Sequence, residues 1–419
     1  MKKVLLLTAF VFLGLSLFSQ EIFIRQTVVV NVEVPVRVFK DGKFVDNISI
    51  DDFEIFEEGI PQKIEAVYLI KKKTVEKREE KKRFSPETKR NFILLFEVSE
   101  YFARLGEAVN YFAHNVIMPG DNLIIITPVK AYMLKDNTFE IKTREEIANR
   151  LKGILRKDIM IGNSEYRSTI SDLTTLARSL SEALKSGNID AITPAAEEEG
   201  DKGLESYWVD PYIGMELDEQ LLYFGSLLHK LEILRRVNQM GLSDFARFLK
   251  DQEGQKYVFL FYQREYLPQI EPRILNQYIS LFQQRIDIVT TITGLFDFHR
   301  RDVSFDVDRM KQTYSDSSVS IHFMYLTTPP KKVSGVRMEE HSEDLFSPFK
   351  EMAEATGGFV GSSSNPVPLF KNALDESENY YLLYYSPKNY TGDGKFKNIK
   401  VRVKNKDYKV THRSGYFAN

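Results

Sequence analysis

The sequence predicts a mixed α/β protein in which a doubly wound, mostly parallel sheet flanked by helices is inserted into a small β-sandwich. Two observations predict this fold class. The middle of the chain alternates short, uniformly apolar segments with amphipathic segments of helical period, which is the pattern of βαβ units. Both ends instead carry β-branched, partly alternating segments separated by turn residues, as antiparallel strands do.

The first residues have the pattern of a secretory signal. Residues 1–3 include two lysines, residues 4–18 are mostly apolar, and polar residues follow, so residues 1–19 are predicted to be a signal peptide cleaved near Ser19. A retained anchor is the alternative, but this apolar segment is short for a membrane span of about 20 residues. No later segment is long and apolar enough to span. We therefore expect an exported protein, periplasmic or secreted, with no transmembrane segment after signal cleavage.

Composition excludes several functional classes. The chain of 419 residues has no cysteine, which excludes disulfides, thiolate catalysis and cysteine-ligated metals. The formal net charge is -2, so no global charge favours a nucleic acid or an anionic membrane as a partner. Residues 71–90 are densely charged and are predicted to be a solvated linker, with a polyanion-binding patch as the alternative.

Strand-like segments lie in residues 20–70 and again in residues 379–419. They are expected at 28–39, 54–56, 64–70, 380–385, 396–403 and 408–417. Neither set is large enough for a stable sandwich by itself, so the two ends are expected to pair into one β-domain. The aromatic run Tyr380–Tyr385 is expected to be half core and half exposed, and a protein-binding surface there is an alternative to simple burial.

The α/β domain is predicted to span residues 91–378, around a central parallel strand at Phe92–Phe96. This run is too short for a helix and too uniformly apolar for a half-exposed strand. Further buried strands are expected at 123–126, 257–262 and 319–326, with helical segments between them. Residues 187–215 break the rhythm with Pro194, an acidic run and the only tryptophan, and are predicted to be an exposed insertion or lid.

A functional site is most expected at the carboxyl end of the central strand. In open α/β sheets, ligands bind outside the carboxyl ends of the strands, and Glu97–Tyr101 is the segment delivered there. Elsewhere the sequence has no G-x-S-x-G, P-loop or HExxH motif, and the six histidines show no paired ligand spacing. A hydrolase is therefore disfavoured, because no nucleophile and base are recognisable.

Several motifs together resemble the exported von Willebrand factor A-related family of bacteria, typified by acidobacterial proteins. The resemblance covers nearly the whole mature chain and implies a Rossmann-like von Willebrand A domain. The motifs are DDFEIFEEGIPQKI at 51–64, ATGG at 355–358, YLLYYSP at 381–387, DGKF at 393–396 and RSGY at 413–416.

The resemblance implies a metal-ion-dependent adhesion site, in which the first strand ends in Asp-x-Ser-x-Ser and a later Thr and Asp complete the ligands. Here these positions fall on Glu97, Ser99 and Tyr101, then on Thr169, and on Glu265 after the strand 257–262. Mg²⁺ demands short oxygen ligands in near-octahedral geometry, whereas glutamate is one methylene longer and the tyrosine oxygen lies too far out. Arg264 would add positive charge beside a cation. The sequence therefore predicts a degenerate site without a metal cofactor.

The function implied is that of an exported, non-enzymatic protein-binding or scaffold protein whose partner the sequence does not name. The alternative is divalent-cation-dependent adhesion, with Mg²⁺ held by Glu97, Ser99 and either Glu265 or Asp172.

Overall fold

The computed structural model describes residues 30–134, 138–186, 212, 215–297 and 305–419. The predicted signal peptide therefore lies outside the described residues, as does the predicted insertion 187–215 except for Tyr212 and Met215. Within the described ranges, no helix is both long and apolar enough to cross a membrane.

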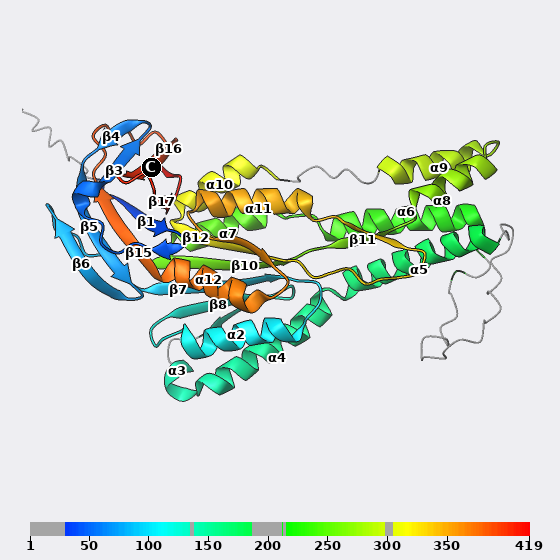
Figure 1. The fold of residues 1–419 in the computed structure, drawn as a ribbon, viewed down its shortest axis with the longest axis horizontal. Helices are drawn as coiled ribbons and strands as arrows, with labels where there is room; N and C mark the ends of the chain where they lie inside the picture. The colour runs from blue at the N-terminus through cyan, green and yellow to red at the C-terminus, as the bar shows by residue number, and fades with distance from the viewer. Residues whose placement is uncertain (1–29, 135–137, 187–211, 213–214, 298–304) are drawn as a thin grey trace, which may run out of the picture.

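A six-stranded, mostly parallel sheet forms the centre of the molecule (Figure 1). Its order is β14–β12–β10–β7–β8–β9, and only β9 runs antiparallel to its neighbour. The strands are β7 (Arg90–Glu97), β8 (Asn122–Ile126), β9 (Ala131–Leu134), β10 (Gln255–Gln263), β12 (Val319–Leu326) and β14 (Val360–Ser363). Along the chain, β8 and β9 follow β7 on one side of it, and β10, β12 and β14 are then added on its other side. The strand order therefore reverses between β7 and β10.

Helices cover both faces of this sheet, which explains why its strands are apolar on both sides. Phe92, Leu94 and Phe96 of β7 face one set of helices, and Ile93 faces the other, because alternate side chains of a strand point in opposite directions. The first set is α2 (Ala103–Asn115), α4 (Arg144–Gly162) and α12 (Pro366–Glu378). The second set is α7 (Gln239–Lys250), α10 (Val307–Asp316) and α11 (Glu343–Ala355).

A helical extension continues beyond the carboxyl ends of the central strands, opposite the antiparallel sheets in Figure 1. It has its own apolar core and includes a two-stranded antiparallel sheet, β11 (Tyr266–Gln269) with β13 (Arg337–Glu340). Its helices are α5 (Ser164–Ser186), α6 (Leu217–Leu234), α8 (Pro272–Leu281) and α9 (Ile286–Asp297). A further short helix, α3 (Thr138–Ile141), precedes α4.

The two ends of the chain pair with each other in two antiparallel sheets, as the sequence predicts. β1 pairs with β15, and β3 pairs with β16, so each sheet joins early and late strands. The sheets share one core, to which Val34, Ile55 and Val401 contribute. The six-stranded sheet contains β1 (Val32–Lys40), β2 (Lys43–Phe44), β5 (Ile64–Lys71), β6 (Thr74–Glu80), β15 (Asn379–Tyr385) and β17 (Lys409–His412). The other contains β3 (Phe53–Glu57), β4 (Ile60–Gln62), β16 (Phe396–Val403) and β18 (Gly415–Phe417).

Two predictions about this region are wrong. The charged segment 71–90 is not simply a linker, because Thr74–Glu80 forms β6 and pairs with β5 at the edge of its sheet. Charged side chains suit an edge strand, and Tyr68 donates a hydrogen bond to Glu80. The aromatic run Tyr380–Tyr385 is buried throughout, because β15 is a central strand with apolar clusters on both faces. A protein-binding surface there is thereby excluded.

Two buried arginines join the antiparallel sheets to the central sheet. Arg37 donates to the carbonyl oxygen of Gly357 at 3.0 Å and to the hydroxyl of Ser320 at 3.0 Å. Arg413 donates to the hydroxyl of Ser318 and to the carbonyl oxygen of Glu33, each at 2.6 Å. Buried charge-assisted hydrogen bonds of this kind are directional, so they fix how the β-strands of the chain ends lie against the α/β part.

Candidate functional site

A cleft lies at the carboxyl ends of β7 and β10, where the strand order reverses. Ligands of open α/β sheets bind at such a switch point. The cleft has a volume of about 420 Å³ and is lined by Glu97 and Ser99 from the end of β7, by Gln263 and Glu265 from the end of β10, and by parts of α5, α6 and α7. A second cleft of about 450 Å³ shares Ser99, Tyr166, Gln263 and Glu265, so these four residues lie between the two.

Gln263 holds the end of β7 in place. Its side-chain oxygen accepts hydrogen bonds from the backbone N–H of Ser99 at 3.0 Å, the hydroxyl of Ser99 at 3.3 Å and the backbone N–H of Glu100 at 3.2 Å. Its amide nitrogen donates to the hydroxyl of Thr328 at 3.2 Å. Because three donors already converge on the oxygen, Gln263 is a structural clamp and offers no free acceptor to a ligand.

Glu97 places a carboxylate in the cleft. Its side chain is open to the cleft, and within the described part of the chain no hydrogen-bond or ion-pair partner contacts its carboxylate. Protein atoms nevertheless surround the carboxylate closely enough to displace part of its hydration. Burial first, and then the charge of Glu265, raise the pKa of Glu97 from an ordinary value of 4.5 to about 7. Near neutral pH, Glu97 therefore exchanges between its neutral and charged forms.

Glu265 is paired with Arg235, which lies just after the end of α6. The guanidinium of Arg235 also donates to the carbonyl oxygen of His341 and lies 4.0 Å from Asp344. Burial alone would lower the pKa of Arg235, but the charges of Glu265 and its neighbours reverse this effect and raise it. A buried arginine is thus held in an ion pair with Glu265 at this wall of the cleft.

Three of the five sequence-predicted residues, Glu97, Ser99 and Glu265, come together in this cleft, and two do not. The hydroxyl of Tyr101 packs over Gly106 of α2, where a Cβ atom would lie only 2.4 Å from it. Thr169 is buried in α5, and its hydroxyl donates to the carbonyl oxygen of Glu165 at 2.9 Å. Neither lines the cleft, so assigning Tyr101 and Thr169 to one site with Glu97 is wrong.

Two further predictions about this region are corrected. Asp172, the alternative ligand, lines neither cleft. Arg264 turns away from Glu97, because it lies 3.1 Å from the carboxylate of Glu340 and packs over the ring of Tyr325. The positive charge expected beside the site comes instead from Arg235, whose position in the sequence carries no motif. Within the described residues, no group of three or more His, Asp or Glu side chains could hold a metal ion.

Glu97→Gln is expected to stabilise the protein more at pH 8 than at pH 5. Between pH 4.5 and 7 the folded state keeps a proton that the unfolded state has lost, so stability falls as pH rises through this window. Glutamine does not ionise, so the substitution removes this loss of stability. Because the side chain is open to solvent, the gain at pH 8 should be only about 1 kcal/mol. Thermal unfolding at both pH values measures it, and an equal change at both would contradict the raised pKa.

No protein-family model matches this chain, no curated protein is similar to it, and no solved structure matches its fold. Its function must therefore be inferred from the geometry of the cleft.

Proposed function

We propose that this chain is an exported, non-enzymatic binding protein, built from a von Willebrand A-like domain with a degenerate cation site mounted on a β-sandwich. We further propose that its cleft binds a basic side chain of a protein partner. One observation carries the proposal: Glu97 presents an unpartnered carboxylate in the cleft, while the groups around it are already engaged by the protein.

The sheet topology supports the fold part of the proposal. Numbered along the chain, the central strands lie in the order 6-5-4-1-2-3, with the switch point between the first and fourth strands and one antiparallel edge strand. This is the doubly wound order that places ligands at strand 1. Two antiparallel sheets that share one core support the sandwich.

The side-chain contacts favour a site that works without a metal. A Mg²⁺ ion takes oxygen ligands that are free to turn toward it. Gln263 accepts three hydrogen bonds, Glu265 is paired with Arg235, and Tyr101 points elsewhere. Among the described residues that line the cleft, only Glu97 has an unengaged carboxylate, which is too few strong ligands for a divalent cation.

The same contacts favour binding over catalysis. The hydroxyl of Ser99 donates to the amide oxygen of Gln263, which is not a base, and no histidine is among the residues that line either cleft. A nucleophile would need a base within hydrogen-bond distance. Glu97 therefore has a recognition role, as an acceptor for a cationic or hydrogen-donating group.

The surroundings of the cleft suit a protein partner. Large apolar side chains are exposed at the ends of the helices that line it, where α4 and α6 finish and α7 begins. They are Met160, Ile161, Ile233, Leu234 and Met240. Leu234 also lines the cleft, and exposed apolar side chains beside a polar group are characteristic of interaction sites. A partner segment would place a lysine or arginine on Glu97 and apolar residues on these side chains.

A peptide array tests this proposal. Peptides in which Lys or Arg is flanked by apolar residues should bind at pH 8, and matched peptides with norleucine in place of the basic residue should not. Glu97→Gln should weaken binding about tenfold, as expected for losing one charge-assisted hydrogen bond. Binding of the wild type should also weaken below pH 7, as Glu97 takes up a proton. Equal affinity of the Glu97→Gln variant would contradict the proposal.

A thermal-shift comparison in EDTA and in Mg²⁺ or Mn²⁺ separates the proposal from cation-dependent adhesion. A ligand that binds only the folded state raises the melting temperature, by an amount that grows with the logarithm of its concentration above Kd, so a chain without a cation site should show no change. A rise that Glu97→Gln abolishes would instead support adhesion through a retained cation.

A further inference from the structure

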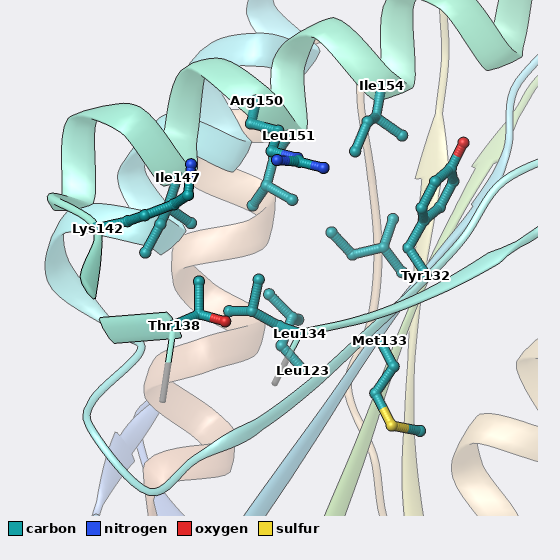
Figure 2. Close-up of a pocket in the computed structure, with 11 residues that line it drawn as sticks. Leu123, Tyr132, Met133, Leu134, Thr138, Lys142, Ile147, Arg150, Leu151 and Ile154 are labelled. Atoms are coloured by element: carbon teal, nitrogen blue, oxygen red, sulfur yellow. The ribbon is translucent and has the colours of Figure 1, made fainter. Parts of the chain in front are cut away.

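A separate cavity lies at the edge of the central sheet, between β8 and β9 on one side and α3 and α4 on the other (Figure 2). Its volume is about 250 Å³, and it shares no lining residue with the clefts at Glu97. It exists because β9 is a short edge strand, so the apolar face of α4 extends over a part of the sheet that few side chains fill.

The interior of this cavity is apolar. Leu123 and Leu134 form its floor, and Ile147, Leu151 and Ile154 of α4 face them in Figure 2. The hydroxyl of Tyr132, also in the lining, already donates to Asp158 at 2.7 Å. A cavity that offers few free hydrogen-bonding groups binds water poorly and hydrocarbon well.

Two cationic side chains lie at the same cavity. Lys142 and Arg150 both line it, both are exposed, and neither has an ion-pair partner within the described part of the chain. Glu146 lies between them in sequence, but its carboxylate accepts hydrogen bonds from the backbone N–H and hydroxyl of Thr143, at 2.8 and 3.1 Å. The charge of Glu146 lies close enough to Lys142 to interact with it, but among the described residues neither Lys142 nor Arg150 is held in an ion pair, so both side chains can turn toward a ligand.

We infer that this cavity binds a medium-chain fatty acid, with its hydrocarbon chain between β9 and α4 and its carboxylate between Lys142 and Arg150. The charges of both side chains complement an anionic head group, and the apolar walls complement the chain. A volume of about 250 Å³ has room for a short hydrocarbon chain, and octanoate is a probe of that kind. This inference does not depend on the function proposed for the cleft at Glu97.

Calorimetric titration of the whole mature chain with octanoate, octanol and octylamine tests the inference. Octanoate should bind more tightly than octanol, and octylamine should not bind. Arg150→Gln and Lys142→Gln should each weaken octanoate binding about fivefold, as expected for a partly exposed ionic contact. Lys157→Gln is the matched control, because it removes an exposed charge from the same helix without touching the cavity.

Ile154→Trp should abolish octanoate binding by filling the cavity, while its near-UV circular dichroism spectrum and its octanoate-free melting temperature establish that it is folded. Absence of octanoate binding to the wild type would overturn the inference. Equal affinities for octanoate and octanol, unchanged in Arg150→Gln, would also overturn it. The inference would also be overturned if the protein sedimented with phosphatidylglycerol vesicles and octanoate did not release it, because Lys142 and Arg150 would then contact a membrane surface.

Discussion

Asp121→Ala should lower the free energy of unfolding by about 3–5 kcal/mol, the cost of removing one partner of a buried ion pair. Asp121 and Arg90 form an ion pair with side chains 0% and 1% exposed. Two parallel hydrogen bonds join them, from Nε of Arg90 at 3.1 Å and from Nη2 at 2.6 Å. Lys73 also lies 2.7 Å from the carboxylate of Asp121, whereas the other carboxylate near Arg90, that of Glu378, is farther away, at 3.7 Å. The carboxylate also accepts from the backbone N–H of Met118 at 2.8 Å, so its loss also leaves that donor without its side-chain acceptor. Urea unfolding at constant m-value measures the change.

Two controls define the origin of this effect. Replacing both partners, as Arg90→Met with Asp121→Ala, should cost less than Asp121→Ala alone, because neither charge then remains buried. Asp46→Ala breaks an exposed pair with Lys71, whose side chains are 54% and 39% exposed, and should change stability by less than about 1 kcal/mol. If Asp121→Ala cost no more than Asp46→Ala, burial would not be what makes the Arg90 pair strong.

The contacts of Asp121 show what can and what cannot be predicted from the sequence. The segment 119–121 is recognisable as the end of a helix, because proline and glycine stop helices. The pairing with Arg90 is not recognisable, since it forms only when the start of β7 and the segment before β8 come together. Similarly, β7, β10 and β12 are evident from their apolar runs, whereas the edge strand β6 is polar and resembles a linker. Local patterns identify elements that are buried on both faces better than elements that are half exposed.

In the cleft, too, some residues can be predicted from the sequence and others cannot. Glu97 and Ser99 are predictable because they follow the most apolar run of the α/β domain, and the chain direction places them at the strand end. The direction of Tyr101 depends on the space left by Gly106, five residues away in the next helix. Arg235 reaches Glu265 from the residue after α6, and no sequence motif marks this position. The end of the central strand can therefore be located from sequence, but which charges lie around it depends on packing between distant elements.

Gly358→Ala should destabilise the protein by at least about 3 kcal/mol, because a Cβ atom there would lie 1.9 Å from the backbone oxygen of Ile321 in β12. That strand cannot yield, since it pairs with β10 on one side and β14 on the other. Gly153→Ala is the matched control: nothing lies within 4 Å of its added methyl group in α4, so it should stabilise by about 0.5–1 kcal/mol. Chemical denaturation distinguishes the two, and a tolerated Gly358→Ala would contradict the close approach.

The neighbouring Gly357 has a φ of +70°, and the backbone of His412 in β17 lies 2.8 Å from where its Cβ would be. The carbonyl oxygen of Gly357 accepts the hydrogen bond from Arg37 of β1, and Thr356 accepts one from the backbone N–H of Ile321 at 3.0 Å. The segment Ala355–Gly358 is thus where α11, the central sheet and the paired chain ends all meet. Its glycines are required by close backbone packing between these parts, which gives this motif a structural cause independent of any ligand.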